Sequence, residues 1–254
     1  MCITFWFILA IHACNGRPAE CDEAADRLAQ AALEGDEWGA QWLAHECALT
    51  AADARANNNR ALRYACEYGH LAWAQWLAAA FNLTRADARA DGGYALLSAC
   101  ANGHLGVAQW LTTAFGLTAA DARGLENYAL RFACRDGHLA VAQWLAATFA
   151  LTVEDVRAYN NCAFQFACAH GHLEVAQWLV VQFGLTKADT SANYALRAAC
   201  VGGYPHVARW LARTFGRSAA DVASCKALRR ARAEHPEEVA QWLEWGRAQE
   251  EAEM

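Results

Sequence analysis

Proline and charged residues are both scarce in this sequence. Its 254 residues include 3 prolines and 17 glycines, and only 19% are charged. So few helix-breaking residues argue against a loop-rich or low-complexity chain. Apolar residues make up 56%, which is ample for a core and does not match a disordered protein. The net charge of −6 and the lack of a Lys or Arg block count against nucleic acid as a partner.

The motifs of common enzyme classes are missing as well. We find no His-Glu-x-x-His, Gly-x-Gly-x-x-Gly, phosphate-binding loop, Cys-x-x-Cys or Gly-x-Ser-x-Gly. We therefore expect a protein that is not an enzyme, with no catalytic residues, no metal and no cofactor. An enzyme whose site carries no recognisable motif is the third class of function that we consider, after the two given below.

What the sequence does contain is an internal repeat. The tripeptide Gln-Trp-Leu recurs with its Trp at 42, 76, 110, 144, 178 and 242, and Arg-Trp-Leu occurs at 210. The spacing is 34 residues four times and then 32 residues twice. A fixed period in this range predicts a solenoid, in which neighbouring units bury each other's apolar faces. Such arrays offer a long binding surface rather than a catalytic pocket.

Each unit reads as two helices joined by a tight turn. In the unit that contains Trp144, the segment Asn127–Asp136 is predicted to be the first helix, with Asn127 as its N-cap. Gly137 should end it in the left-handed conformation that glycine favours. The second helix is expected over Leu139–Phe149, whose apolar residues follow the spacing of one helical face.

A Thr-x-x-Asp motif follows each second helix. This spacing is typical of a capping box, so we expect a short third helix in the connection between units. Both two-residue deletions fall after this Asp, and therefore in the loops. The motif recurs as Thr50/Asp53, Thr84/Asp87, Thr118/Asp121, Thr152/Asp155, Thr186/Asp189 and Ser218/Asp221.

The unit resembles the ankyrin repeat. Its pattern Tyr-Ala-Leu-Arg-Phe-Ala-Cys-x-x-Gly-His-Leu-x-Val-Ala-Gln-Trp-Leu, from Tyr128 to Leu145, is similar to Thr-Pro-Leu-His-Leu-Ala-Ala-x-x-Gly-His-Leu-x-Val-Val-x-Leu-Leu. The Ala-Gln-Trp-Leu form is similar to ankyrin-type proteins of large DNA viruses of amoebae. The resemblance implies an all-α solenoid of about seven helix-turn-helix units. Because Thr-x-x-Asp replaces the usual Gly-Ala-Asp-Val-Asn hairpin, we expect short helices instead of hairpin fingers.

We divide the chain into an apolar N-terminal segment at 1–23, the repeat array at 24–245 and an acidic tail at 246–254. The apolar stretch is too short to span a bilayer, so a membrane partner is not expected. It fits a helical cap, the remnant of a degenerate repeat, a signal-like segment or a mis-assigned start. We expect a cytoplasmic protein, with secretion through residues 1–15 left open. We also expect a monomer.

Three residue types recur at fixed positions of the units, and we predict structural roles for them. The cysteines should be buried thiols, because equivalent positions in stacked helices are too far apart for disulfides. One His per unit cannot assemble a metal site, so a role in the turn is expected. The Trp residues are predicted to be core between units. The sets are Cys66, Cys100, Cys134, Cys168 and Cys200, and His70, His104, His138 and His172.

An arginine also recurs at one position of the first helix. Two interpretations stay open: it binds an acidic partner, or it pairs locally, for example with the Asp of the Thr-x-x-Asp turn. The residues are Arg63, Arg131, Arg197 and Arg229.

Two stretches vary between units while the rest repeats, and they are our candidate binding residues. They lie in the loop before the first helix and at the end of that helix. Variation could place specificity there, or reflect a lack of constraint. We expect Tyr68, Arg135 and Tyr159 to be the anchors, since aromatic residues and Arg dominate interface hot spots. The candidate set is Asn57, Asn58, Glu67, Tyr68, Asp91, Asn102, Leu125, Glu126, Arg135, Asp136, Tyr159, Asn160 and His170.

The resemblance implies a scaffold that binds a protein partner on its concave face. The alternative is an adaptor that recruits substrates to a ubiquitin-ligase complex. No F-box is recognisable in residues 1–23, so an adaptor would need a separate linking protein.

Overall fold

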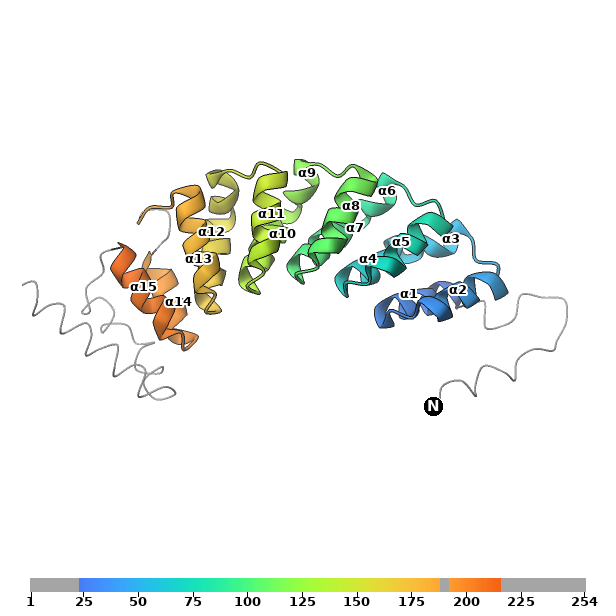
Figure 1. Ribbon diagram of the computed structural model, residues 1–254, viewed down its shortest axis with the longest axis horizontal. Helices are drawn as coiled ribbons and strands as arrows, with labels where there is room; N and C mark the ends of the chain where they lie inside the picture. Colours follow the sequence, from blue (N-terminus) through green and yellow to red (C-terminus); the bar gives the residue numbers. More distant parts are fainter. Residues whose placement is uncertain (1–22, 188–191, 216–254) are drawn as a thin grey trace, which may run out of the picture.

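The computed structural model describes residues 23–187 and 192–215, which form an arch of paired helices (Figure 1). Six units are present in this part of the chain, and no strand occurs in it, so the all-α solenoid is confirmed. Several predictions fall on residues outside this range. They concern the N-terminal segment, the acidic tail, Asp189, Ser218/Asp221, Arg229 and the unit of Trp242.

Three kinds of helix repeat along the chain. The first helices of the units are α1 (Ala24–Glu34), α4 (Ala56–Glu67), α7 (Ala90–Ala101), α10 (Gly124–Arg135), α12 (Val153–Ala169) and α14 (Ala192–Val201). The second helices are α2 (Glu37–Glu46), α5 (Leu71–Ala80), α8 (Leu105–Phe115), α11 (Leu139–Thr148), α13 (Leu173–Phe183) and α15 (Pro205–Phe215). Short helices precede three of the first helices, at α3 (Ala51–Ala54), α6 (Arg85–Ala88) and α9 (Ala119–Ala122).

The core runs through the stacked first helices. Each of them packs against the first helix of the next unit, whereas each second helix packs mainly on its own unit. In α10 the inward residues are Ala129, Leu130, Ala133 and Cys134, all at most 1% exposed. Small Ala and Cys side chains let neighbouring helices approach closely. The interpretation of the repeated cysteines as buried residues is confirmed, and burial raises the pKa of the Cys134 thiol.

The Gly-His turns bring successive units into contact at the inner edge of the arch (Figure 1). Gly137 has φ +80°, and a Cβ placed there would lie 2.5 Å from Nδ1 of His172 in the next unit. Glycine is therefore required by both the backbone and the neighbouring ring. The same contact joins Gly69 to His104 and Gly103 to His138. Burial lowers the pKa of His104, His138 and His172, so acid disfavours their packed state.

The repeated tryptophans pack at the margin of the core. Trp144 is only partly buried, while Leu145 beside it is 1% exposed. The Trp144 ring meets Phe149 of its own unit edge-on, with centroids 5.5 Å apart, and Trp110 meets Phe115 in the same way at 5.5 Å. The Trp ladder thus covers the core rather than filling it.

The Thr-x-x-Asp motifs form the expected capping boxes. In α9, the backbone N–H and the hydroxyl of Thr118 both donate to Oδ2 of Asp121, at 2.7 and 2.9 Å. Equivalent boxes begin α3, α6 and α12. The prediction of a short helix in place of a hairpin is confirmed for α3, α6 and α9. In the fifth unit this short helix is the first part of α12, and non-helical residues at 158–161 separate it from the rest.

One prediction at the start of the first helix is wrong. Asn127 is not an N-cap: it has φ +59°, its side-chain amide donates to the Asp155 carbonyl at 3.3 Å, and its Oδ1 accepts no hydrogen bond. It ends a turn of three successive left-handed residues. Such turns occur at 57–59, 91–93, 125–127 and 159–161. Asn, Asp and Gly fill nine of these twelve positions, because they tolerate positive φ best.

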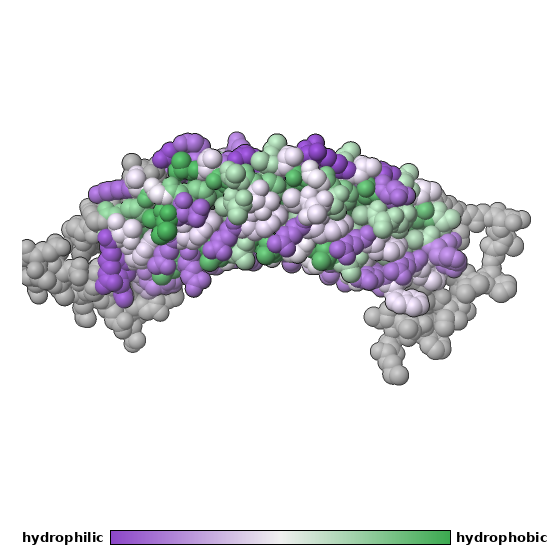
Figure 2. Space-filling view, turned by 45° about the horizontal axis from the view of Figure 1, so that its top comes forward, coloured by the Kyte–Doolittle hydropathy of each residue, from purple (hydrophilic) through white to green (hydrophobic). Residues whose placement is uncertain are grey.

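The surface that results is elongated and mixed in character. Figure 2 shows apolar and weakly polar residues running along the length of the array, with strongly hydrophilic residues in separate patches. Across the described ranges, no helix is long and apolar enough to cross a membrane.

The Gly-His contact generates a stability prediction with a matched control. Gly103→Ala should lower the free energy of unfolding by about 2–4 kcal/mol, from left-handed strain plus a clash with His138. Gly116→Ala should cost about 1 kcal/mol, since Gly116 has φ +58° but no atom lies within 4 Å of its added Cβ. Urea denaturation followed by circular dichroism measures both. Equal losses would contradict the role assigned to the ring.

Candidate partner-binding face

The first helices carry a second stripe, opposite the core. In α10 it consists of Tyr128, Arg131, Phe132 and Arg135, at the i, i+3, i+4 and i+7 positions of one helical face. All four side chains are half-buried. This stripe, rather than the core face, is the part of α10 that a partner can reach.

Side chains of the fourth and fifth units join this stripe into one group, which we call the aromatic–arginine cluster. The Tyr128 and Phe132 rings stack with centroids 4.1 Å apart, and Phe132 meets Phe166 of α12 at 6.0 Å. The Arg135 guanidinium lies 4.2 Å from the Phe132 centroid. The Arg131 guanidinium lies 4.6 Å from the Tyr159 centroid. The cluster comprises Tyr128, Arg131, Phe132, Arg135, Tyr159 and Phe166.

The two stretches of candidate residues lie at opposite ends of the first helices. The loop residues form the left-handed turns at the start of the helix, and the helix-end residues lie beside the Gly-His turn. The aromatic–arginine cluster connects the two ends in the fourth and fifth units. Arg131 bridges from the Leu125 carbonyl, 2.9 Å from Nη2, to the Tyr159 ring. Arg135 occupies the other end of the same stripe.

The turn residues are held largely through their backbones. Arg63 donates to the carbonyls of Asn57 and Asn58, at 3.2 and 3.1 Å, and forms an ion pair with Asp91 of the next unit at 2.7 Å. Gln165 donates to the Asn160 carbonyl at 2.7 Å. The residue at this helix position therefore braces the turn of its own unit in the second, fourth and fifth units.

The helix-end residues differ in how free they are. Tyr68 is 48% exposed and stacks over His70. Arg135 instead donates two hydrogen bonds to Asp136, at 2.8 Å each. These bonds lower the pKa of Asp136. Asn102 donates to the Ser98 carbonyl at 2.9 Å. His170 contacts the Phe166 carbonyl with Nδ1 at 3.0 Å, and Glu67 is half-buried.

Tyr128, Arg131, Phe132 and Phe166 belong to the cluster but not to our candidate set. The outward stripe of α10 was legible in the sequence, because the same helical spacing that marks the core face also marks its opposite. Our candidate set was drawn from positions that vary between units, and it therefore left out Tyr128 and Arg131, whose residue types recur in other units.

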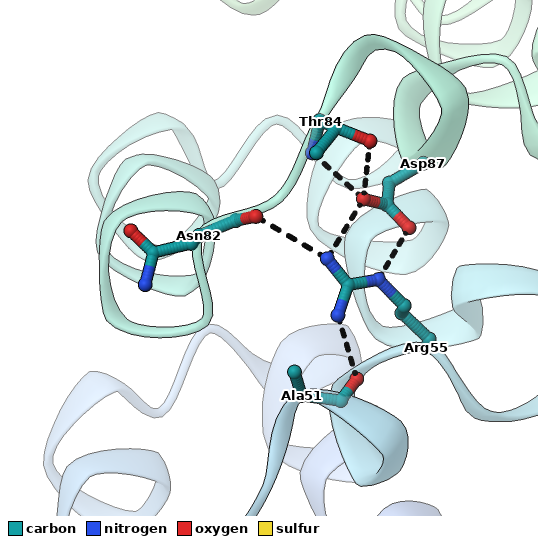
Figure 3. A network of polar contacts seen from close by, with 5 residues as sticks. All are labelled: Ala51, Arg55, Asn82, Thr84 and Asp87. Atoms are coloured by element: carbon teal, nitrogen blue, oxygen red, sulfur yellow. Dashed lines mark hydrogen bonds and ion pairs between the residues drawn. The ribbon is translucent and has the colours of Figure 1, made fainter.

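The local pairing expected for the recurring Arg63 and Arg131 involves other partners than the Thr-x-x-Asp turn. The Asp of the motif pairs instead with an arginine from the preceding unit. That arginine stands two positions after the Asp of its own motif. Arg55 reaches Asp87 with Nε–Oδ1 2.8 Å and Nη2–Oδ2 3.1 Å, and also donates to the Asn82 carbonyl (Figure 3). Arg89–Asp121 and Arg123–Asp155 repeat this bidentate pair. The recurring Asp-x-Arg spacing was the signal that we missed.

These ion pairs lie at the outer edge, where the short helices are (Figure 1). Burial alone would raise the pKa of Asp121, but hydrogen bonds from Arg89 and Thr118 lower it to about 2. Each pair links one unit to the next, as the Gly-His contact does at the inner edge. They are therefore assigned to the scaffold and not to the candidate binding face.

Three turn residues adopt positive φ without being Asn, Asp or Gly. Leu125, Glu126 and Tyr159 have φ of +49°, +55° and +53°. Leu125 is 55% exposed and Tyr159 is 62% exposed, so burial does not repay the strain. Such strain tends to persist at functional positions. Leu125 and Tyr159 both flank Arg131 at the edge of the aromatic–arginine cluster.

The positions of the His, Cys, Asp and Glu side chains also bear on metal binding. Among the residues that the structure describes, no three His, Cys, Asp or Glu side chains gather as ligands for a metal ion.

Comparison with known families agrees with the fold. Family models described as ankyrin repeats match residues 28–121, as three copies, and residues 130–180, as many copies. Together they cover more than half of the chain. No curated protein sequence matches it.

The Arg89–Asp121 pair predicts a defined pH dependence. At pH 7, Asp121→Asn should lower the free energy of unfolding by about 1–3 kcal/mol, because a charge-assisted bidentate bond is lost. The folded-state pKa is lowered from 3.8 to about 2, so the contribution is present above pH 3.8 and disappears as pH falls toward 2. Chemical denaturation across pH 2–7 measures the difference between wild type and variant. A difference that stays constant down to pH 2 would contradict the assignment, and Glu126→Gln serves as an exposed control.

The strained turn predicts a stabilising substitution. Leu125→Asn should raise the free energy of unfolding by about 0.5–1 kcal/mol, since Asn tolerates positive φ and little burial is lost. Leu125→Ala is the control, because it keeps the strained conformation and should bring no gain. Thermal and urea unfolding compare the three proteins. A gain for Ala as large as that for Asn would show that the strain is not the cause.

Proposed function

Because the chain belongs to the ankyrin-repeat family, we propose that it is a scaffold that binds a protein partner on the face formed by its first helices. The observation that carries this proposal is the aromatic–arginine cluster. Aromatic residues and Arg supply most of the binding energy in protein interfaces. The proposed role requires no catalytic group.

The cluster is also arranged in advance of binding. Tyr128, Phe132 and Phe166 pack on one another, and two guanidinium groups are held against rings. Side chains that are already ordered lose less conformational entropy when a partner docks. Rigid rings beside oriented Arg groups thus suit an interface centre, with Leu125 and Tyr159 at its rim.

The face formed by the second helices α5, α8 and α11 lacks such anchors, and this contrast supports the first-helix face as the binding face. The exposed residues of α5, α8 and α11 are Ala, Gly, Thr and Gln, without a ring or a charge among them. Such short, uncharged side chains offer few anchors. They are Ala72, Gln75, Ala79, Ala80, Gly106, Gln109, Thr113, Ala114, Ala140, Gln143, Ala147 and Thr148.

Affinity capture with two matched variants tests the face. Tyr68→Asn, Leu125→Asn and Tyr159→Asn combined remove exposed apolar groups from the first-helix side without touching the core. We expect this variant to lose partner capture at least tenfold. Trp38→Asn with Val181→Asn, whose side chains are 83% and 84% exposed on second helices, should capture as wild type does.

The capture experiment also separates the modes of action. Quantitative mass spectrometry of the bound proteins and circular dichroism of the variants are the measurements. Co-recovery of cullin-type components would favour the ubiquitin-ligase adaptor, and a single unrelated partner would favour a simple scaffold. Loss of capture in the second-helix variant alone would overturn the proposed face.

A further inference from the structure

Two arginines at the same position of the first helix differ in how their charge is neutralised. Arg63 in the second unit and Arg131 in the fourth unit both brace the left-handed turn of their own unit. Twenty-eight residues after Arg63 stands Asp91, which pairs with it at 2.7 Å. Twenty-eight residues after Arg131 stands Tyr159, whose ring replaces the carboxylate. The charge of Arg131 is thus held in place but not neutralised.

The surroundings of Arg131 contain no substitute for that carboxylate. Its Nη2 donates to the Leu125 carbonyl at 2.9 Å, while its Nε is buried and makes no hydrogen bond. No acidic side chain of the described residues lies within ion-pair distance of it. A half-buried guanidinium without a carboxylate partner is costly to cover further unless an acceptor arrives.

A second guanidinium increases the local positive charge. Arg135 lies on the Phe132 ring, and Arg131 lies 5.8 Å from the same centroid. Among the described residues, Asp136 is the one carboxylate bonded to this pair, and both of its oxygens bind Arg135. The aromatic–arginine cluster therefore keeps one excess positive charge in a chain of net charge −6.

We propose that Arg131 binds a carboxylate of the partner, and that the bound segment is acidic. This inference rests on the proposed function, since it concerns the same face. The guanidinium fork matches a carboxylate with two parallel hydrogen bonds. An apolar residue beside that Asp or Glu packs on the exposed Leu125 and Tyr159 side chains. A phosphate backbone fits less well, because in the described part of the chain no row of basic residues continues beyond Arg131 and Arg135.

Selection from a displayed library of random 12-residue peptides, with the full chain as bait, tests the recognised chemistry. We expect enrichment of sequences with Asp or Glu next to an apolar residue. Fluorescence anisotropy then compares an enriched peptide with its Asn/Gln counterpart, which should bind about tenfold more weakly. Arg131→Gln should weaken binding of the acidic peptide about tenfold. Arg63→Gln, the matched control whose charge is already paired, should change binding less than twofold.

A pair of substitutions at Tyr159 isolates the charge from the ring. Tyr159→Asn and Tyr159→Asp both suit the left-handed turn and both remove the ring. Only Tyr159→Asp places a carboxylate beside Arg131, as Asp91 does beside Arg63. We therefore expect Tyr159→Asp to bind the acidic peptide about tenfold more weakly than Tyr159→Asn. Circular dichroism should show the same helix content for both.

The possible outcomes separate this inference from the proposed function. Enrichment without acidic residues, no enrichment, equal effects of Arg63→Gln and Arg131→Gln, or equal binding by the two Tyr159 variants would each overturn it. So would tighter binding of a single-stranded oligonucleotide of equal charge, weakened by Arg131→Gln. If partner capture is still lost in the first-helix variant, the proposed face stands while its acidic specificity fails. If capture is unaffected, the face itself is wrong.

Discussion

The close approach of each Gly-His turn to the turn of the next unit governs this fold. An imidazole ring occupies the space where a side chain on the preceding Gly would begin. The contact sets the spacing of the units at the inner edge, and the Ala and Cys residues of the first helices then allow the same spacing in the core. Where Tyr204 replaces His in the sixth unit, the turn contains an additional glycine, Gly202, packed against the same ring.

The outer edge of the arch is held in a different way. There the bidentate Arg–Asp pairs span a wider gap, which the short helices α3, α6 and α9 fill (Figure 1). A narrow inner contact combined with a wide outer one produces curvature. The chain must then return from the outer edge into the next first helix, and the left-handed turn makes that return. The proposed binding face includes these connections, because the Leu125 and Tyr159 side chains are exposed on them.

The fold could be predicted from the sequence to a large extent because its determinants are local. Helical spacing, the Gly at the end of the first helix and the Thr-x-x-Asp box each act within a few residues, and each was correctly interpreted. The left-handed turn was missed because Asn before a helix also suits an N-cap, and Asn127 satisfies both patterns. The Arg55–Asp87 pair joins residues 32 positions apart, so only the three-dimensional arrangement reveals it. The aromatic–arginine cluster also depends on contacts between units, such as Arg131 with Tyr159.

The contacts between units occur at constant offsets, and this has an evolutionary consequence. A Gly meets its His after 35 residues, and an Arg meets its Asp after 32, in every central pair of units. Each unit thus presents a Gly and an Arg to the unit that follows, and a His and an Asp to the unit that precedes it. Duplication, loss or exchange of a whole 34-residue cassette would leave every remaining junction chemically intact. A gene of this kind can lengthen its product, or shuffle its recognition residues, by recombination alone.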